Sequence, residues 1–306
     1  NNIREIPQGL GNLVNLIELD VSENSLEALP EDICKLSALQ TLNVSENGLA
    51  ALPEDFGALA NLETLSAFKN QLTQLPDSIS GCVKLSEVNF FNNKLIKVPA
   101  SMADLENLID LNLGGNKIKS LPSTRKWAVL ERLALSWNSI VMLQDFGGMP
   151  KLRQLQLNRN QLETLPDDAF EGCEELESVD VSTNRFAELP VSLYACSSVQ
   201  TIDATSNALA TLGDFSAMKD LRILKLGSNK LQDIAAANLG ACEALETLFL
   251  LDNQLTKLPG DLVNLKNLSR MNVATNAALD RTDEETAKVV ATLSAQCAQL
   301  KGRWIE

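Results

Sequence analysis

Residues 39–61 read LQTLNVSENGLAALPEDFGALAN, and residues 62–84, LETLSAFKNQLTQLPDSISGCVK, repeat the same arrangement of Leu, Asn and Leu-Pro. An asparagine marks each copy, and successive asparagines lie 22 to 24 residues apart. They are Asn24, Asn47, Asn70, Asn93, Asn116, Asn138, Asn160, Asn184, Asn207, Asn229, Asn253 and Asn276. A period of this length is typical of a solenoid, in which each repeat forms one coil and neighbouring coils share a continuous core.

The spacing within a repeat separates buried positions from exposed ones. Leu42 and Val44 flank the polar Asn43, which is the period of a strand with one face toward the core. Strands of successive coils would then build a parallel sheet on the concave side. The amide of each marker asparagine can satisfy backbone groups that the following turn would leave buried and unpaired. The pattern therefore predicts an α/β solenoid.

The segments outside the strands are too short for full helices. Proline follows leucine near the start of most of them and suits the opening of a short 3₁₀ or extended piece, because no N–H is needed there. These residues are Pro7, Pro30, Pro53, Pro76, Pro99, Pro122, Pro166, Pro190 and Pro259. A thin convex layer predicts a shallow arc. Three repeats lack this proline, around Phe146, Phe215 and Leu239, either because their cores are filled differently or because they face a partner.

The two ends of the chain differ. Thr282 to Glu285 has the form of a helix capping box, and apolar residues then recur at helical spacing up to Leu300. We expect a helix over 283–301 that covers the last core layer, with Gly302 as its stop and Trp304 and Ile305 beneath or beside it. The last repeat is expected to be degenerate, because Ala278 is small.

This pattern predicts a solenoid over residues 1–279, with one partial and about twelve full repeats, and a capping helix and tail over 280–306. Residues 1–7 correspond to the second half of a repeat whose strand is missing. The sequence is therefore expected to be a fragment of a longer protein, or to have lost its first cap.

The composition excludes several kinds of function. The 306 residues carry a net charge of −14 and contain no histidine, which removes Ser/His/Asp and Cys/His catalysis and His-liganded metal sites. There is no Gly-rich phosphate loop, and no apolar run is long enough for a membrane span. The acidic balance argues against nucleic acid. We therefore expect no catalytic, cofactor-binding or metal-binding residues, and no enzyme within this chain.

The repeat, read from Leu39 through Asn47 to Leu-Pro at 52–53, resembles the leucine-rich repeat family in its intracellular 23-residue form. This form is similar to Ras-suppressor-type scaffolds and to regulatory subunits of type-one protein phosphatase. The resemblance implies a scaffold, adaptor or regulatory subunit that binds a protein partner on its concave face. The alternative is the recognition domain of a larger ubiquitin ligase, cyclase or kinase whose catalytic part lies outside this chain.

The six cysteines indicate in which cellular compartment the protein is expected to reside. Extracellular members of the family usually carry disulfide clusters in their caps, and this sequence shows none, so we expect a cytoplasmic protein. Four of the cysteines occupy a core position that leucine fills in other repeats, where a free thiol acts as a small apolar group. We also expect the chain to be monomeric or part of a larger chain.

The repeat register identifies the candidate binding residues. Positions one, two, four and six before each marker asparagine should point out of the concave face, and most of them hold small or polar residues. The large exceptions are Phe68, Phe91, Arg132, Trp137 and Arg159, followed by a second group of Ile223, Phe249 and Leu251. Exposed aromatic residues beside arginine are typical of binding hot spots, although the rings could instead only cover their own sheet.

Overall fold

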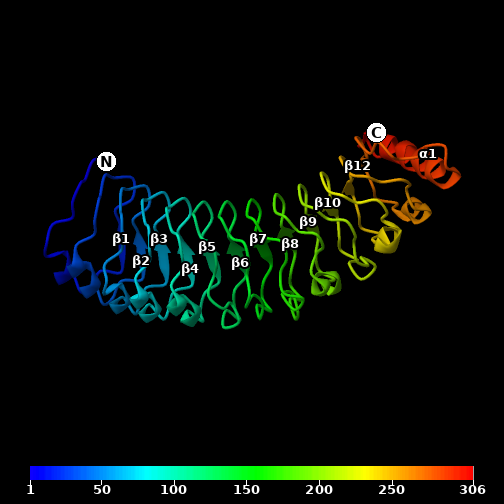
Figure 1. The fold of residues 1–306 in the computed structure, drawn as a ribbon. Coiled ribbons are helices and arrows are strands. Elements are labelled where there is room, and N and C mark those ends of the chain that lie inside the picture. The colour runs from blue at the N-terminus through cyan, green and yellow to red at the C-terminus, as the bar shows by residue number, and fades with distance from the viewer. Residues whose placement is uncertain (306) are drawn as a thin grey trace. The chain divides into compact units, whose positions relative to one another are not determined.

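The computed structural model describes residues 1–305. The chain divides into unit 1, Asn1–Leu152, and unit 2, Arg153–Glu306. In unit 1, neighbouring strands pair in parallel in the order of the sequence (Figure 1). They are β1 (Glu18–Asp20), β2 (Thr41–Asn43), β3 (Thr64–Ser66), β4 (Glu87–Asn89), β5 (Asp110–Asn112) and β6 (Arg132–Ala134).

Unit 2 repeats this arrangement, again with parallel pairs in sequence order. Its strands are β7 (Gln154–Gln156), β8 (Ser178–Asp180), β9 (Thr201–Asp203), β10 (Ile223–Lys225), β11 (Thr247–Phe249), β12 (Arg270–Asn272) and β13 (Arg303–Ile305). Between β2 and β6, and between β7 and β12, the central residue of each strand is buried and its two neighbours are more exposed, with Thr247 of β11 as an exception. The predicted parallel-sheet solenoid is confirmed, whereas its predicted shallow curvature stays a prediction.

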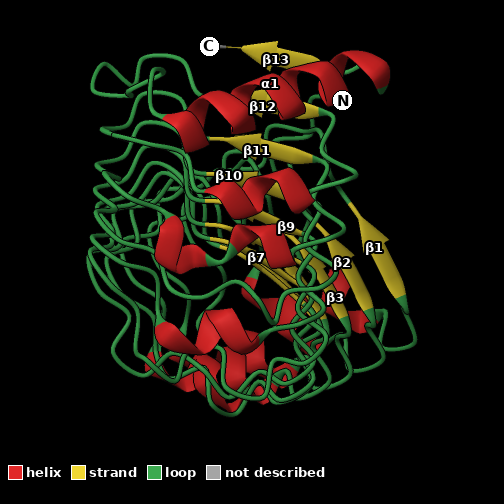
Figure 2. Ribbon diagram, turned by 90° about the vertical axis from the view of Figure 1, so that its right-hand side faces the viewer, coloured by secondary structure: helices red, strands yellow, loops and turns green. Residues whose placement is uncertain are grey.

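Short 3₁₀ helices form the turns opposite the strands (Figure 2). Unit 1 contains η1 (Leu10–Asn12), η2 (Glu31–Lys35), η3 (Phe56–Ala58), η4 (Asp77–Gly81) and η5 (Ala100–Asp104). Unit 2 contains η6 (Val191–Ala195), η7 (Ala235–Ala237), η8 (Leu239–Ala241) and η9 (Gly260–Asn264). Proline caps the start of several of them in an extended conformation, as at Pro30 and Pro76, which confirms its predicted role.

The marker asparagines form a ladder of buried and half-buried side chains, as predicted. Asn93 is representative: its Nδ2 donates to the carbonyl oxygens of Ala67 (2.9 Å) and Phe90 (3.1 Å). Its Oδ1 accepts from the backbone N–H of Leu72 at 3.0 Å. Ala67 and Leu72 belong to the preceding repeat, so one side chain satisfies backbone groups of two coils. We call these residues the ladder asparagines.

The residue before each ladder asparagine has a left-handed backbone, which the repeat pattern does not predict. Its φ lies between 51° and 58° at every non-glycine member of the set, including Trp137 and Arg159, and is 67° at Gly115. This conformation costs an ordinary L-residue about 1–2 kcal/mol, so the surrounding hydrogen bonds must impose it. The side chains at this position are therefore held at a fixed angle.

The three repeats that lack the proline fill their cores with their own large apolar side chains. Phe146, Met149, Phe215 and Met218 are all buried, which supports alternative core filling. Leu239 is buried as well. In the last repeat Ala278 is exposed while Leu279 is buried, so the core position has shifted by one residue, in keeping with the predicted degeneracy.

Helix α1 (Glu284–Gln299) packs on η9 and β13, and Figure 2 shows it beside β13. Its buried residues include Val289 and Leu293. The predicted capping box is wrong. Asp283, rather than Thr282, caps the helix by accepting from Thr286 N at 2.9 Å. The Oε1 of Glu285 accepts instead from Gly260 N in the preceding repeat, at 2.8 Å.

The end of α1 brings the tail into the sheet. Lys301 adopts the left-handed conformation, with φ of 55°, and Gly302 N donates to Cys297 O at 2.8 Å, so the helix stops before Gly302. Arg303–Ile305 then pairs with β12 as the strand β13. The expectation that Trp304 and Ile305 would pack beneath or beside the helix missed this strand. Within residues 1–305, no helix combines the length and the apolar character needed to cross a bilayer.

Candidate functional site

The strand face of unit 1 comprises the positions one, two, four and six before its ladder asparagines Asn24, Asn47, Asn70, Asn93, Asn116 and Asn138. The predicted register is confirmed at its aromatic residues. Phe90 is fully buried, whereas Phe91 keeps 40% of its surface exposed. Leu135 is fully buried, whereas Trp137 is 55% exposed. Neither exposed ring belongs to the core.

Phe68 and Phe91 take the same position in adjacent repeats. Phe68 is half-buried, and the ammonium of Lys69 lies 5.9 Å from the centre of its ring. That distance is within the range of a cation–π contact. The two loops also join through a hydrogen bond from Lys69 N to Phe91 O, at 2.8 Å. The prediction that these phenylalanines lie side by side is consistent with this arrangement.

The ring of Phe91 leans over a pair of glycines in the next repeat. A Cβ atom added at Gly114 would lie 3.3 Å from its Cδ2, and one at Gly115 would lie 3.4 Å from its Cε2. The missing side chains therefore leave room for the ring beside the backbone. Phe91 is supported on one side and open to solvent on the other, which suits a contact surface more than a core residue.

Trp137 lies at the left-handed position before Asn138, with φ of 58°. Its carbonyl oxygen accepts from Asn116 N at 3.2 Å, which links it to the preceding repeat. The left-handed conformation costs a tryptophan about 1 kcal/mol or more and does not bury its ring. The residue before every ladder asparagine shares this conformation, so the strain belongs to the repeat, and the exposure of the Trp137 ring is what makes it a candidate contact.

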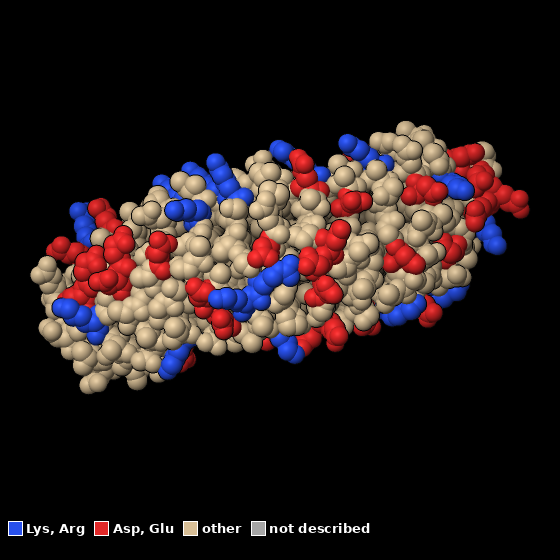
Figure 3. All heavy atoms as spheres, turned by 60° about the horizontal axis from the view of Figure 1, so that its bottom comes forward, with Lys and Arg blue, Asp and Glu red and all other residues tan. Residues whose placement is uncertain are grey.

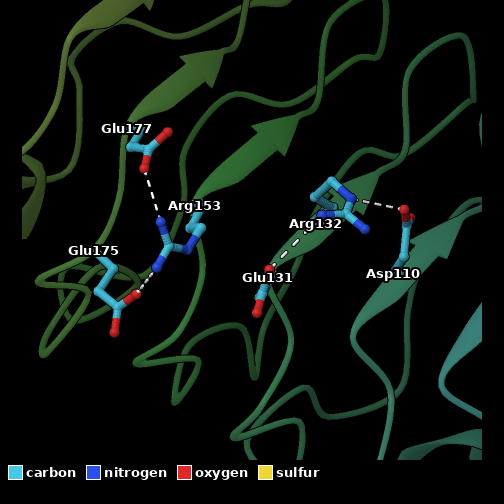
Figure 4. A network of polar contacts seen from close by, with 6 residues as sticks. All are labelled: Asp110, Glu131, Arg132, Arg153, Glu175 and Glu177. Carbon is cyan, nitrogen blue, oxygen red and sulfur yellow. Dashed lines mark hydrogen bonds and ion pairs between the residues drawn. The ribbon is translucent and has the colours of Figure 1, made fainter.

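Arg132, on β6, is engaged within unit 1. Its Nε donates to Asp110 Oδ2 at 2.7 Å and its Nη1 lies 3.7 Å from Glu131 Oε2 (Figure 4). The hydrogen bond from Arg132 to Asp110 raises the pKa of the guanidinium, so its charge is fixed and locally compensated. The predicted role of Arg132 in partner contact stays a prediction.

In unit 2, Arg159 is exposed and has the same left-handed conformation, with φ of 58°. Its predicted stacking on Trp137 stays a prediction. The second predicted group lies on adjacent strands, with Ile223 on β10, Phe249 on β11 and Leu251 directly after β11. All three are half-buried. Leu251 fills the space above Gly227, where an added Cβ would lie 2.5 Å from its Cδ2, so part of this group serves packing.

Asp180 is a carboxyl group in unit 2 whose pKa is raised. Burial raises the pKa of its carboxyl, and the charge of Asp203 raises it further, although Ser182 donates to it from both N (2.9 Å) and Oγ (2.7 Å). The ammonium of Lys225, which pairs with Asp203 at 3.0 Å, acts in the opposite direction. Burial is the largest of these effects, so the folded protein holds the proton more tightly than the unfolded chain does.

We therefore expect Asp180→Asn to stabilise the protein more at pH 7 than at pH 3.5. The pKa of Asp180 is higher in the folded protein than in the unfolded chain. Its protonation therefore stabilises the fold below the pKa of the unfolded state, and this stabilisation is lost as the pH rises through the pKa of the folded state. Urea unfolding at about pH 3.5 and about pH 7 measures the difference. Asp20→Asn is the control of opposite sign, because hydrogen bonds from Ser22 lower the pKa of Asp20. Equal effects of Asp180→Asn at both pH values would contradict the assignment.

Arg153 was missed by the sequence analysis. It lies seven residues before Asn160, outside the four outward-facing positions of the repeat, and pairs with Glu175 and with Glu177, the latter at 3.0 Å (Figure 4). The same position holds Glu63 and Glu131 in unit 1. The signal that could have revealed it is this charged row, read along the repeats.

The structure offers little for chemistry. Within residues 1–305, no group of three or more Cys, Asp or Glu side chains could hold a metal ion. Asp32, in the acidic pair after Leu29 and Pro30, has a structural role, because its Oδ2 accepts from Gly9 N at 2.7 Å. The basic cluster around Trp127 is compensated, since Lys126 pairs with Asp104 and Arg125 with Asp145, and Trp127 itself is fully buried. On the face drawn in Figure 3, basic side chains stand among acidic ones without forming a continuous basic area.

Comparison with known proteins agrees with this fold. The chain is 36% identical to human podocan-like protein 1 over 123 residues, which is 38% of this chain and 24% of that protein. It is 34% identical to lumican from Oryctolagus cuniculus over 142 residues, 45% of this chain and 73% of lumican. The structure of YopM from Yersinia enterocolitica is similar, with a TM-score of 0.65 and 26% identity over 89% of this chain and 58% of that one.

The chain thus spans about a quarter of podocan-like protein 1 and somewhat more than half of the YopM chain. A family model described as leucine rich repeat matches residues 1–49, 128–186, 150–209 and 219–277, together more than half of the chain. These stretches contain nine of the twelve ladder asparagines, all except Asn70, Asn93 and Asn116. The chain belongs to the leucine-rich repeat family.

Proposed function

We propose that this chain is a protein-binding module, acting as a scaffold, adaptor or regulatory subunit, and that its strand faces contact the partner. The observation that carries the proposal is the exposure of Phe91 and Trp137 on a face that, apart from the half-buried Phe68, is made of small or polar side chains. Large aromatic residues dominate the energetics of protein interfaces, because they bury much apolar area with little loss of side-chain freedom. Recognition on behalf of a larger enzyme stays an alternative prediction.

Replacing the two exposed rings tests this proposal. We expect the double variant Phe91→Ser, Trp137→Asn to lose at least about tenfold in partner affinity, as truncation of a hot spot does. Thermal stability should change little, since both rings are substantially exposed and Asn tolerates the left-handed conformation of residue 137. Affinity capture from native extract, followed by titration of the captured protein, gives the first quantity, and a melting curve gives the second.

Val191→Ser is the matched control, because Val191 is the most exposed of the large apolar residues and belongs to η6, away from the strands. It should leave both affinity and melting temperature unchanged. Partner affinity equal to wild type in the double variant would refute the proposal. A large drop in melting temperature would instead identify Phe91 and Trp137 as packing residues.

The Ile223, Phe249 and Leu251 group is proposed as a second contact, on unit 2. Its three side chains are half-buried and Leu251 covers Gly227, so less of its surface is available than at Phe91 or Trp137. Phe249 is the best probe, because its register partner on β10 is the hydrophilic Lys225. A partner contact at this group would add to that of unit 1.

We further propose that the chain is of the 23-residue Leu-Pro type and resides in the cytoplasm. Six free, buried cysteines support a reducing compartment, and several of their thiols donate to backbone carbonyls, as Cys82 Sγ does to Phe56 O at 3.3 Å. Burial raises the pKa of Cys82 to about 12 and that of Cys34 to about 11. These thiols therefore act as apolar core groups and remain protonated.

The same burial predicts slow thiol chemistry in the folded protein. At about pH 8 the thiolate fraction of Cys82 is on the order of 10⁻⁴, given a pKa of about 12. We expect Ellman's reagent to label all six cysteines within seconds in denaturant and to react orders of magnitude more slowly without it. Rapid labelling of the folded protein would show that the core opens readily or that the thiols are accessible.

A further inference from the structure

The charges of the strand face of unit 1 are strongly unbalanced. Its carboxylates are Glu18, Asp20, Glu23, Glu46, Glu87 and Asp110, and its cations are Lys69 and Arg132. Both cations are neutralised locally, because Lys69 pairs with Glu46 at 3.1 Å and Arg132 pairs with Asp110 at 2.7 Å. The face therefore presents excess negative charge to any partner.

Four of these carboxylates, those of Glu18, Asp20, Glu23 and Glu87, form no ion pair with any of the described residues 1–305. Three of them lie together on β1 and the loop that follows it. Asp20 is held in its charged form, because hydrogen bonds from Ser22 lower its pKa. All four residues are exposed, so a partner can reach them.

The aromatic residues of this face also suit a cationic partner. The ammonium of Lys69 already lies 5.9 Å from the centre of the Phe68 ring, so the molecule itself places a cation against one of these rings. Phe91, at the same position in the next repeat, exposes 40% of its surface. A lysine or arginine from a partner would find both a ring face and nearby carboxylates.

Building on the proposed function, we propose that the strand face of unit 1 recognises a basic polypeptide segment that crosses its strands. Basic residues at one end of the segment contact Glu18, Asp20 and Glu23, and a further one contacts Glu87. Apolar or long side chains farther along the segment cover Phe91 and Trp137. Anionic lipids and nucleic acids would be repelled by the same carboxylates.

The dimensions of the sheet set the length that a helical segment needs to cross it. Five strand spacings separate β1 from β6, which at about 4.8 Å each amounts to about 24 Å. A helix of about 16 residues spans that distance. The contacts with Glu18, Asp20 and Glu23 and the contact with Trp137 would thus lie at opposite ends of one such helix, with those to Glu87 and Phe91 between them.

A random phage-displayed library of peptides about 16 residues long tests this without a known partner. Wild-type protein is compared with a face variant, in which four carboxylates are neutralised, and with a turn variant that removes equal charge elsewhere. The face variant carries Glu18→Gln, Asp20→Asn, Glu23→Gln and Glu87→Gln. The turn variant carries Glu27→Gln, Glu31→Gln, Glu54→Gln and Asp77→Asn, all exposed and off the strand face.

We expect the peptides selected on wild type to be enriched in Lys and Arg. A synthetic peptide of the consensus should bind the face variant at least about tenfold more weakly and the turn variant within about twofold. Raising NaCl from about 50 to about 500 mM should weaken binding to wild type as the neutralisation does.

Selection of peptides without Lys or Arg enrichment, or equal affinity for the face variant and wild type, would overturn the basic-segment proposal. If those peptides still depend on Phe91 and Trp137, the protein-binding function survives while the partner chemistry is wrong. If no selected peptide depends on either the carboxylates or the rings, both proposals fail.

Discussion

Asn93→Ala is expected to destabilise the protein by about 3 kcal/mol, because it removes a ladder side chain at a fully formed position. The backbone N–H of Leu72 loses its acceptor, and Leu72 is fully buried. The carbonyls of Ala67 and Phe90 suffer less, since each also accepts from a neighbouring ladder asparagine, Asn70 at 3.2 Å and Asn116 at 3.0 Å. Three effects account for the expected loss. The N–H of Leu72 has no acceptor, the carbonyls of Ala67 and Phe90 each lose one donor, and the missing side chain leaves a cavity.

Urea unfolding followed by circular dichroism measures this loss, with the slope of the transition checking that the extent of unfolding is unchanged. Asn24→Ala is the matched control, because Asn24 is only partly buried and its Oδ1 accepts from the exposed Ile3 N. Water can replace that bond, so we expect a loss of about 1 kcal/mol. Equal effects of the two substitutions would show that the ladder is not a buried network.

Gly57→Ala is expected to cost a similar amount for a different reason, which is direct collision between coils. A Cβ atom at Gly57 would lie 1.9 Å from the carbonyl oxygen of Ser78 and 3.2 Å from Gly81 Cα. Both obstacles are backbone atoms of η4, so η3 and η4 would have to move apart. We expect a loss of about 3 kcal/mol, at the upper end of the usual cost of overpacking.

Gly172→Ala separates collision from backbone strain. Gly172 has a φ of 76°, and an added Cβ would meet nothing within 4 Å, so only the left-handed conformation is penalised, by about 1 kcal/mol. Melting temperatures of the two variants against wild type make the comparison. If Gly57→Ala lost no more stability than Gly172→Ala, η3 and η4 would separate easily. Their close approach would then contribute little to the stability of unit 1.

The repeat fixed most of the fold in advance, because one period assigns the inside and the outside of every coil. The ladder asparagines, the strand register and the 3₁₀ turns after proline all follow from positions that recur many times. Features that occur once were harder to predict. Asp283 and Thr282 are both good helix caps one residue apart, and the choice between them is coupled to the contact of Glu285 with Gly260 in another repeat. β13 follows the capping helix and is not part of a repeat, so the repeat pattern does not predict it.

The candidate site was predictable in position but not in detail. The spacing correctly placed Phe91 and Trp137 outside the core, yet it could not distinguish the half-buried Phe68 from the more exposed Phe91. Exposure depends on what stands in the next repeat, and the glycines at 114 and 115 determine how Phe91 rests. The pairing of Arg132 with Asp110 likewise depends on two side-chain conformations, which a period cannot specify.

The left-handed position before each ladder asparagine has a consequence for how such a chain can diversify. It carries Glu46, Lys69, Asn92, Trp137 and Arg159 on the same backbone geometry, so acid, base, amide and indole have been interchanged there without altering the scaffold. Neighbouring copies within a unit stand about one strand spacing apart, close to 5 Å. Substitutions in this single column would therefore change recognition stepwise while the scaffold is kept, which makes it the natural starting point for engineering new specificities.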